Sequence, residues 1–133
     1  MAANDMAAKW DAFCDTLKAA GQELTQDHVP NDEQSQAEGL RYLSRMARAA
    51  LEWYVEFNDA AFPVLYQPAH ETIKLGADNP DNVYQKAVID GHFDYRLTGR
   101  RGSIDYISFA TSKGSYAENF KQIETGFLDS NTL

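Results

Sequence analysis

Residues 76–109 read GADNPDNVYQKAVIDGHFDYRLTGRRGSIDYISF, and this stretch decides the predicted fold. It begins with a run of turn-forming residues at positions 78–82, where Asn and Asp side chains bond to nearby backbone and Pro fixes φ. Residues 83–89 are rich in β-branched and aromatic types, which favours a strand. We therefore expect the chain to turn at 78–82 and to continue as a β-strand.

Two further strands are predicted after this one. Asp90-Gly91 is a hairpin signal, because a type I′ turn needs a positive φ at both of its central residues. Over residues 93–97 apolar and polar side chains alternate, which is typical of an antiparallel strand with one exposed face. Residues 99–102 predict a second turn, and residues 103–111 a third strand. The stretch is therefore interpreted as an antiparallel β-meander.

The front of the chain has the pattern of two helices. Asn4 or Asp5 is placed to cap a helix that runs to about Ala20, and Asn31 or Asp32 to cap a longer one. The second helix is expected to reach about Asn58, and small Ala residues on its apolar face indicate close approach to the first. The apolar face of the first helix contains Met6, Trp10, Phe13, Leu17 and Leu24.

These elements define an α+β fold class. We expect a helical hairpin over residues 1–60, packed on an antiparallel β segment over residues 61–133, and together they form a single domain. A chain of 133 residues is long enough to bury about two-thirds of its unfolded surface. Near the end, residues 116–123 have weakly helical spacing, and residues 129–131 are typical of a turn.

The same stretch carries a family resemblance. The motifs are DNPDN-x-Y, A-x-IDG, DYR-x-x-G-x-RG and Y-x-SF, together with the upstream segment AEGLRYLSRMARAALEWYVEFNDAAFPVLYQPAHETIKLGADNPDN. Over residues 36–128 the chain resembles the bacterial family known as domain of unknown function twelve-fourteen. The resemblance implies helices followed by a jelly-roll-like β domain. It also implies that this chain corresponds to the front portion of a longer protein.

The charge of the chain excludes some partners. The net charge is −8, and most of the excess lies in residues 1–60, so we expect no general affinity for nucleic acid or for an anionic membrane. Cys14 has no second cysteine to pair with, and its place in a helix favours a packing role. The N-terminus has no signal-peptide pattern, so the default expectation is a soluble, cytoplasmic protein.

One candidate metal site is a set of alternating polar residues. Asp90, His92 and Asp94 would share one face of a strand, and imidazole and carboxylate groups suit a divalent cation. Two of the three flank a tight turn, however, where polar residues are common anyway. No dinucleotide, P-loop, zinc or nucleophile motif occurs in the sequence, so we assign neither a metal nor a cofactor.

A second candidate is the neighbouring pair His70 and Glu71. With Asp78 and Asp81 on a nearby loop, it contains the groups needed for general acid–base chemistry. Nothing in the spacing fixes their geometry. Whether the protein is an enzyme is left open.

A third candidate is a ligand-binding rim made of hydrogen-bonding groups. Asn79, Asn82 and Tyr84 lie at the predicted strand entrance, Arg96 lies on a sheet face, and His70 completes the set. In the competing interpretation, the Asn and Asp side chains bond to the turn backbone and Arg96 pairs with a carboxylate across strands. The structural interpretation is the simpler of the two.

A basic row of three arginines lies on the predicted second helix. Arg41, Arg45 and Arg48 recur at helical spacing, which suits ion pairs with Glu38 and Glu52. They could alternatively anchor a carboxylate or phosphate, or the missing part of a longer protein.

Two functions follow from this sequence. In the first, the protein binds or acts on a small, partly apolar molecule between sheet and helices, in a cavity lined by aromatic residues. In the second, the chain is a non-catalytic assembly segment that pairs with itself, as a homo-oligomer, or with the remainder of a larger protein. The first predicts an enclosed cavity, and the second an exposed apolar surface. The aromatic residues expected to line the cavity are Tyr84, Tyr95, Tyr106 and Phe109.

Overall fold

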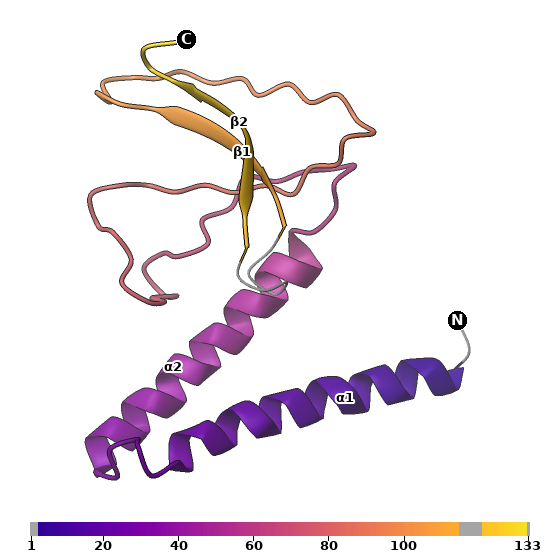
Figure 1. Ribbon diagram of the computed structural model, residues 1–133, viewed down its shortest axis with the longest axis vertical. Helices are drawn as coiled ribbons and strands as arrows, with labels where there is room; N and C mark the ends of the chain where they lie inside the picture. The colour runs from indigo at the N-terminus through magenta and orange to yellow at the C-terminus, as the bar shows by residue number, and fades with distance from the viewer. Residues whose placement is uncertain (1–2, 115–120, 133) are drawn as a thin grey trace. The chain divides into compact units, whose positions relative to one another are not determined.

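The computed structural model describes residues 3–114 and 121–132. Its regular elements are two long helices, each followed by one short helical turn, and two antiparallel strands near the end (Figure 1). This composition confirms the α+β class. The chain divides into two compact units, Met1–Asp94 and Tyr95–Leu133, and each is described by itself.

The first helix, α1, spans Ala3–Gln22. It begins one residue before Asn4, so the predicted capping by Asn4 or Asp5 is wrong and Asp5 lies in the first turn instead. There it pairs with Lys9, the two charged atoms lying 3.2 Å apart. The helix continues through Gly21 and passes directly into a short 3-10 turn at Glu23–Thr25.

The second helix, α2, spans Glu33–Leu51, and Asp32 is its N-cap. The Ser35 amide donates to Oδ1 of Asp32 at 2.9 Å, which satisfies one of the free N–H groups of the first turn. Of the two caps predicted for this helix, Asn31 and Asp32, the structure confirms Asp32. After Leu51 the backbone continues as a π-helical turn, Glu52–Glu56, which ends close to the predicted limit.

One face of α2 is covered by the segment that follows it. Arg48 Nη1 donates to Thr72 Oγ1 at 3.1 Å, and the Gly76 amide donates to Tyr42 Oη at 3.0 Å. The predicted close approach of α1 occurs near the start of α2, where a Cβ atom at Gly21 would lie 4.0 Å from a methyl group of Leu43. Leu24, in the 3-10 turn after α1, approaches α2 more closely, at Gly39. A Cβ atom there would lie 2.9 Å from a methyl group of Leu24. The rest of this cover comes from the crossing segment, residues 64–78, and not from α1.

The small core of the first unit lies between α2 and the crossing segment. Among the described residues the buried hydrophobic ones are Ala49, Tyr66 and Ile73. Tyr66 stacks on Phe57 with ring centroids 5.0 Å apart. Burial, and secondarily the proximity of Tyr54, raise the pKa of the Tyr66 hydroxyl above its ordinary value.

The predicted first two strands of the meander are not regular strands here. Residues 83–89 make one isolated antiparallel bridge, in which Lys86 and Tyr66 exchange two backbone hydrogen bonds of 2.8 and 2.9 Å. Residues 93–97 have no strand assignment, and Gly91 lacks the positive φ of a type I′ turn. A strand needs a neighbour along its length to form a ladder, and the bridge that the structure describes within residues 83–89 is at Lys86.

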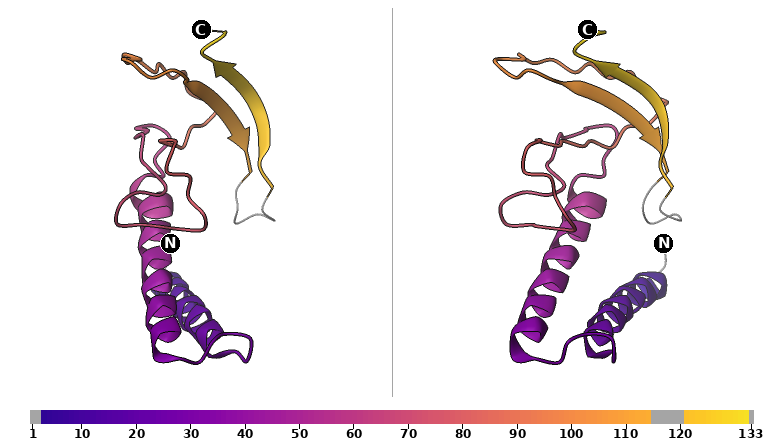
Figure 2. Two further views of the ribbon diagram at one scale, coloured as in Figure 1. Left: turned by 90° about the vertical axis from the view of Figure 1, so that its left-hand side faces the viewer. Right: turned by 60° about the vertical axis from the view of Figure 1, so that its left-hand side comes forward.

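The second unit contains the antiparallel pair β1, Ser108–Lys113, and β2, Ile123–Asp129. β1 overlaps the third predicted strand. Figure 2 shows the segment over residues 95–107 turning back on itself before it enters β1, and Gly102 has a φ of 65°. The helical spacing predicted for residues 116–123 is wrong at Ile123, where β2 begins; residues 115–120 lie outside the described ones.

Both ends of this strand pair are fixed by local contacts. At one end, the Ile107 amide donates to Ser130 Oγ at 2.8 Å, and this hydroxyl donates to the Ile107 carbonyl at 3.1 Å. At the other, Gly114 has a φ of 89°, a conformation that favours glycine. The predicted turn over residues 129–131 is confirmed by a backbone bond of 3.0 Å from the Thr132 amide to the Asp129 carbonyl.

Candidate functional site

The most connected polar group of the first unit joins the end of α2 to the crossing segment. Arg48 Nε donates to Glu52 Oε1 at 2.9 Å, and Glu52 Oε2 lies 3.8 Å from His70 Nε2. The Thr72 amide and hydroxyl both lie 3.4 Å from His70 Nδ1. The side chains of Glu52 and His70 are each 25% exposed. We call Arg48, Glu52, His70 and Thr72 the His70 cluster.

The hydrogen bonds of the His70 cluster indicate its chemistry. Because the Thr72 N–H points at Nδ1, that nitrogen accepts, and the proton of a neutral ring then lies on Nε2, facing Glu52. The Glu52 carboxylate lies near this nitrogen, at 3.8 Å, without a direct hydrogen bond, and is itself held by Arg48. The acceptor nitrogen, which a general base would need, is already engaged by Thr72. The arrangement therefore holds the crossing segment on α2.

Sequence reasoning assigned the wrong carboxylates to His70. The predicted partners were Glu71, Asp78 and Asp81, but Asp78 pairs with Lys74 at 2.9 Å, and His70 faces Glu52. Glu52 lies 18 positions before His70 in the chain, so no local pattern links them. One sequence signal pointed to Glu52: it lies four residues after Arg48 on the same helix face, so an ion pair could be expected to hold its carboxylate in place.

The predicted ligand-binding residues of the first unit form local turn contacts. Asn79 Oδ1 accepts from the Asp81 amide at 2.9 Å, as in an Asx turn. Asn82 Nδ2 donates to Tyr84 Oη at 3.3 Å, so these two predicted residues are brought together. His70 belongs to the His70 cluster instead. Arg96 is exposed and lies in the second unit, and its role in a common rim stays a prediction.

The candidate metal residues form a two-residue contact. His92 Nδ1 lies 2.6 Å from Asp90 Oδ1. The backbone N–H of His92 and then its ring hold the pKa of the Asp90 carboxyl below its ordinary value. Within residues 3–114 and 121–132, no group of three or more His, Cys, Asp or Glu residues is placed to hold a metal ion.

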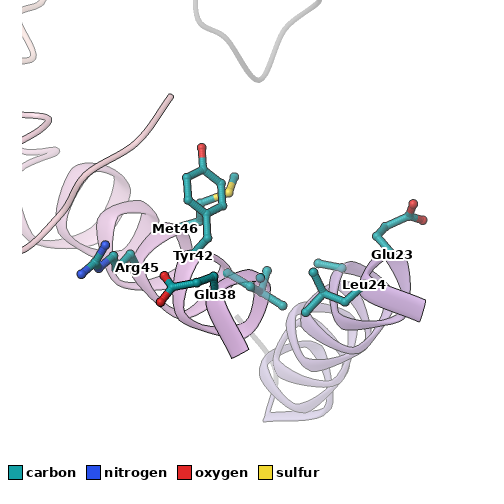
Figure 3. Close-up of a pocket in the computed structure, with 9 residues that line it drawn as sticks. Glu23, Leu24, Glu38, Tyr42, Arg45 and Met46 are labelled. Atoms are coloured by element: carbon teal, nitrogen blue, oxygen red, sulfur yellow. The ribbon is translucent and has the colours of Figure 1, made fainter. Parts of the chain in front are cut away.

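A hollow opens between the end of α1 and the start of α2, and Figure 3 shows it at close range. Its volume is about 540 Å³, within the range of small-molecule sites, roughly 300–1,000 Å³. We call this space the helix hollow. None of the five predicted ligand-binding residues lines it. Its lining comprises Ala20, Glu23, Leu24, Glu38, Gly39, Tyr42, Leu43, Arg45 and Met46.

The arginine row of α2 divides into paired and unpaired members. Arg41 contacts Glu38 at 3.3 Å, and Arg48 contacts Glu52, which confirms the predicted ion pairs. Arg45 lines the helix hollow, and it has no ion-pair partner among the described residues. It is therefore the member of the row that remains open to a ligand or a partner.

Two other features of the described chain bear on function. Cys14 is a free, half-buried cysteine of α1. In the part of the chain that the structure describes, neither helix is both long and apolar enough to span a bilayer.

Comparison with solved structures finds a bacterial protein of the same fold. The match is the crystal structure of an uncharacterized protein from Burkholderia cenocepacia. It covers 93% of this chain, with 53% sequence identity and a TM-score of 0.84. The match occupies 34% of that protein, so this chain spans about a third of its length. No protein-family model and no curated protein matches, and the comparisons thus supply a fold without a named activity.

Proposed function

We propose that this chain is an assembly segment, whose apolar faces are covered by further polypeptide. The observation that carries the proposal is the balance of burial. Among the described residues, three hydrophobic side chains are buried, whereas 24 large hydrophobic ones are exposed. Single exposed apolar residues are normal, but extensive apolar surface marks an interaction site.

The total exposed area supports the same proposal. The protein exposes 11249 Å², whereas a folded monomer of 14.9 kDa should expose about 7,000 Å². The unfolded chain would expose about 21,600 Å², so about half of that surface is buried. This is less than the expected two-thirds, which supports the proposal that further polypeptide covers part of the chain.

The exposed side chains of the strand pair in the second unit support the same proposal. Phe109 and Leu128 are cross-strand partners and share one face of the ribbon. Phe127 alternates with Leu128 and therefore lies on the other face. Phe127 and Leu128 are each 50% exposed, and Phe109 is 37% exposed. A two-stranded ribbon is marginal on its own, and this one has apolar side chains to bury on both faces.

The longer similar protein suggests the wider setting of the segment. Because the chain spans about a third of the Burkholderia cenocepacia protein, we propose that it acts as one portion of a larger body. This accords with the resemblance to domain of unknown function twelve-fourteen, which implies longer proteins. We further propose that residues 83–89 and 93–97 become strands of a jelly-roll-like sheet when neighbouring strands are present.

An apolar dye provides the test of uncovered surface. We expect the purified 133-residue chain to enhance the fluorescence of anilinonaphthalene sulfonate strongly, because the dye binds exposed apolar patches. Phe127→Ser and Leu128→Ser together should reduce this signal, whereas Asn131→Ser, a nearby polar replacement, should not. A chain that binds no dye and unfolds cooperatively would contradict the assembly proposal.

A small-molecule role is the second candidate, and the helix hollow is the observation that favours it. Its lining is mainly apolar, its Glu38 is paired with Arg41, and its Arg45 has no ion-pair partner among the described residues. These features suit a small apolar molecule with an anionic head. A fatty acid of medium chain length is a suitable probe, with calorimetry as the measurement. Binding that is lost in Arg45→Ala but kept in Arg41→Ala would support this role, and no binding would remove it.

A further inference from the structure

We propose that an added β-strand from further polypeptide completes the outer edge of β1, the side of this strand that faces away from β2. The proposal rests on the proposed assembly function and names the contact through which the covering polypeptide is held. It also names the chemistry of the partner, an extended strand with apolar side chains on both of its faces. Figures 1 and 2 show β1 and β2 as a two-stranded ribbon.

The contacts of Ile107, just before β1, show which backbone groups of this strand point away from β2. The Ile107 amide donates to Ser130 Oγ at 2.8 Å, and its carbonyl accepts from the same hydroxyl at 3.1 Å. Both groups therefore point toward the side of β2. In an antiparallel pair this direction alternates from one residue to the next. Every second residue of β1 therefore presents its N–H and C=O groups outward: Ser108, Ala110 and Ser112.

The end of β2 supports this alternation independently. Ser108 pairs with Asp129 in the register, so the backbone groups of Asp129 should also point away from the partner strand. The Asp129 amide donates to Thr132 Oγ1 at 2.8 Å, and its carbonyl accepts from the Thr132 amide at 3.0 Å. Both groups thus bond within the terminal turn and not to β1, as the alternation requires.

The outer edge of β2 is closed to an added strand along much of its length. The terminal turn already uses both backbone groups of Asp129. Further along, β1 pairs with Gly126 and then with Glu124, so β2 has a bulge at Thr125. Bulges and charged side chains are means by which proteins block the edge of a sheet. β2 has both, since Glu124 and Asp129 are carboxylates.

The outer edge of β1 lacks these blocks. Its sequence, SFATSK, contains no proline, and its charged residue, Lys113, lies at its end. Ser108, Ala110 and Ser112 are exposed. Within residues 3–114 and 121–132, β2 is the strand that pairs with β1, and no further backbone bond joins these three residues to another segment. An unpaired row of this kind is a template for another strand.

The chemistry of this row selects an extended backbone as the occupant. Alternating N–H and C=O groups are satisfied by a second strand, whose own groups repeat at the same spacing. A helix uses its backbone groups internally, and so does not offer such a row. Phe109 and Phe127, on opposite faces of the ribbon, are 37% and 50% exposed. An added strand with apolar side chains on both faces extends both surfaces.

Polypeptide outside this chain is the proposed source of the strand. The match to the Burkholderia cenocepacia protein occupies 34% of that protein, so most of its length lies outside the matched part. The partner is accordingly the remaining polypeptide of a longer protein. A second copy of this chain, joined edge to edge, is an alternative that the experiment distinguishes by its dependence on concentration.

Amide hydrogen exchange in the 133-residue chain, followed by NMR, tests the orientation of β1. We expect exchange at Phe109 and Thr111, whose N–H groups face β2, to be at least about tenfold slower than at Ser108 and Ala110. Phe109→Pro should abolish the slow exchange at Thr111. Ala110→Pro is the matched control and should keep it, because the Ala110 N–H lies on the open edge. Equal loss in the two variants would reverse the orientation and overturn the proposal.

The same measurement on the Burkholderia cenocepacia protein tests the added strand. At the amides that superpose on Ser108, Ala110 and Ser112, exchange should be at least about tenfold slower than in this chain. Fast exchange at all three in the longer protein overturns the proposal. Slow exchange in this chain alone also overturns it. If that slow exchange is independent of concentration, the chain covers its own edge, and if it appears only at high concentration, a second copy does.

The apolar dye separates this proposal from the assembly function. If the three amides exchange fast in the longer protein, and it enhances anilinonaphthalene sulfonate fluorescence less per mole than this chain does, the added strand is wrong and the assembly function stands. If the amides exchange fast and the longer protein enhances the fluorescence equally, its remaining polypeptide covers neither the edge nor the apolar faces, and both proposals fail.

Discussion

Ile73 is the most deeply buried side chain that the structure describes, with no exposed surface. It lies in a tight pairing with His70, in which each backbone amide donates to the other's carbonyl, at 3.0 and 3.1 Å. The same residue thus links the apolar core of the first unit to the polar His70 cluster. Truncating the Ile73 side chain should therefore weaken both the core of the first unit and the His70 cluster.

We expect Ile73→Ala to lower the free energy of unfolding of the first unit by about 2–5 kcal/mol, because it leaves a cavity in a small core. Ile73→Val removes one methylene and should cost about 0.5–1.5 kcal/mol. Urea unfolding followed by circular dichroism measures both. Equal, negligible effects would show that Ile73 is not a core residue.

Asp32 makes the start of α2 sensitive to acid. The hydrogen bonds from the side chain and then the backbone of Ser35 hold the pKa of the Asp32 carboxyl below its ordinary value. Because the folded-state pKa is depressed, the carboxylate's contribution is complete above the unfolded pKa and is lost as the pH falls through the folded one. We expect the Ser35 amide resonance to shift in that acid range.

Asp32→Asn is the matched control for this titration. It keeps an oxygen acceptor for Ser35 without an ionisable group, so the helix start should persist and its pH response should vanish. Asp32→Ala should lose helix content at neutral pH. An unchanged acid response in Asp32→Asn would assign the titration to another carboxyl.

Local contacts of this kind can be predicted from sequence, and non-local ones cannot. Asp32 and Ser35 are three residues apart, and the capping pattern is written in that spacing. The partners Glu52 and His70 meet because the chain folds back after α2, which no spacing records. The same limit left the helix hollow unpredicted, although Leu24, one of its lining residues, was visible as part of an apolar stripe.

At the scale of elements, the strand pair depends on one glycine conformation. Gly114 has a φ of 89°, and a Cβ atom there would lie 2.4 Å from the Lys121 carbonyl oxygen. We expect Gly114→Ala to weaken the β1–β2 pairing by more than about 1 kcal/mol, because a side chain is strained in that conformation and also clashes. Amide hydrogen exchange across β1 and β2 is the measurement.

Gly99 provides the control in the same unit. A Cβ atom at Gly99 meets no heavy atom within 4 Å, and its φ is not positive. Gly99→Ala should therefore leave exchange in both strands unchanged. Equal effects of the two substitutions would contradict a specific requirement at Gly114.

The elements differ in how far the sequence determines them. The helices follow from caps and apolar periodicity, which are local, and their observed limits lie close to the predicted ones. Residues 83–89 have strand-forming side chains, yet a strand also needs a partner. In the part of the chain that the structure describes, the bridge that they make joins Lys86 to Tyr66. β2 was missed because helical spacing at Ile123 outweighed a strand pattern that depends on pairing with β1.

At the scale of the whole molecule, composition predicts an ordinary globule and the structure has a small core. Hydrophobic residues make up 44% of the chain, which is a normal share. Most of the large ones, from Met6 on α1 to Leu128 on β2, remain exposed. Composition gives the number of apolar residues but not which of them are buried. The small core and the many exposed hydrophobic residues therefore could not be predicted from it.

The heat capacity change of unfolding tests the central claim most directly, because it scales with the apolar surface that folding buries. An ordinary domain of 133 residues should give about 1.6–2.0 kcal/mol/K. Since this chain buries about half of its unfolded surface instead of two-thirds, calorimetry at concentrations where it is monomeric should give about 1.1–1.4 kcal/mol/K. A value in the ordinary range would show that the chain covers its own apolar faces and would contradict the assembly function.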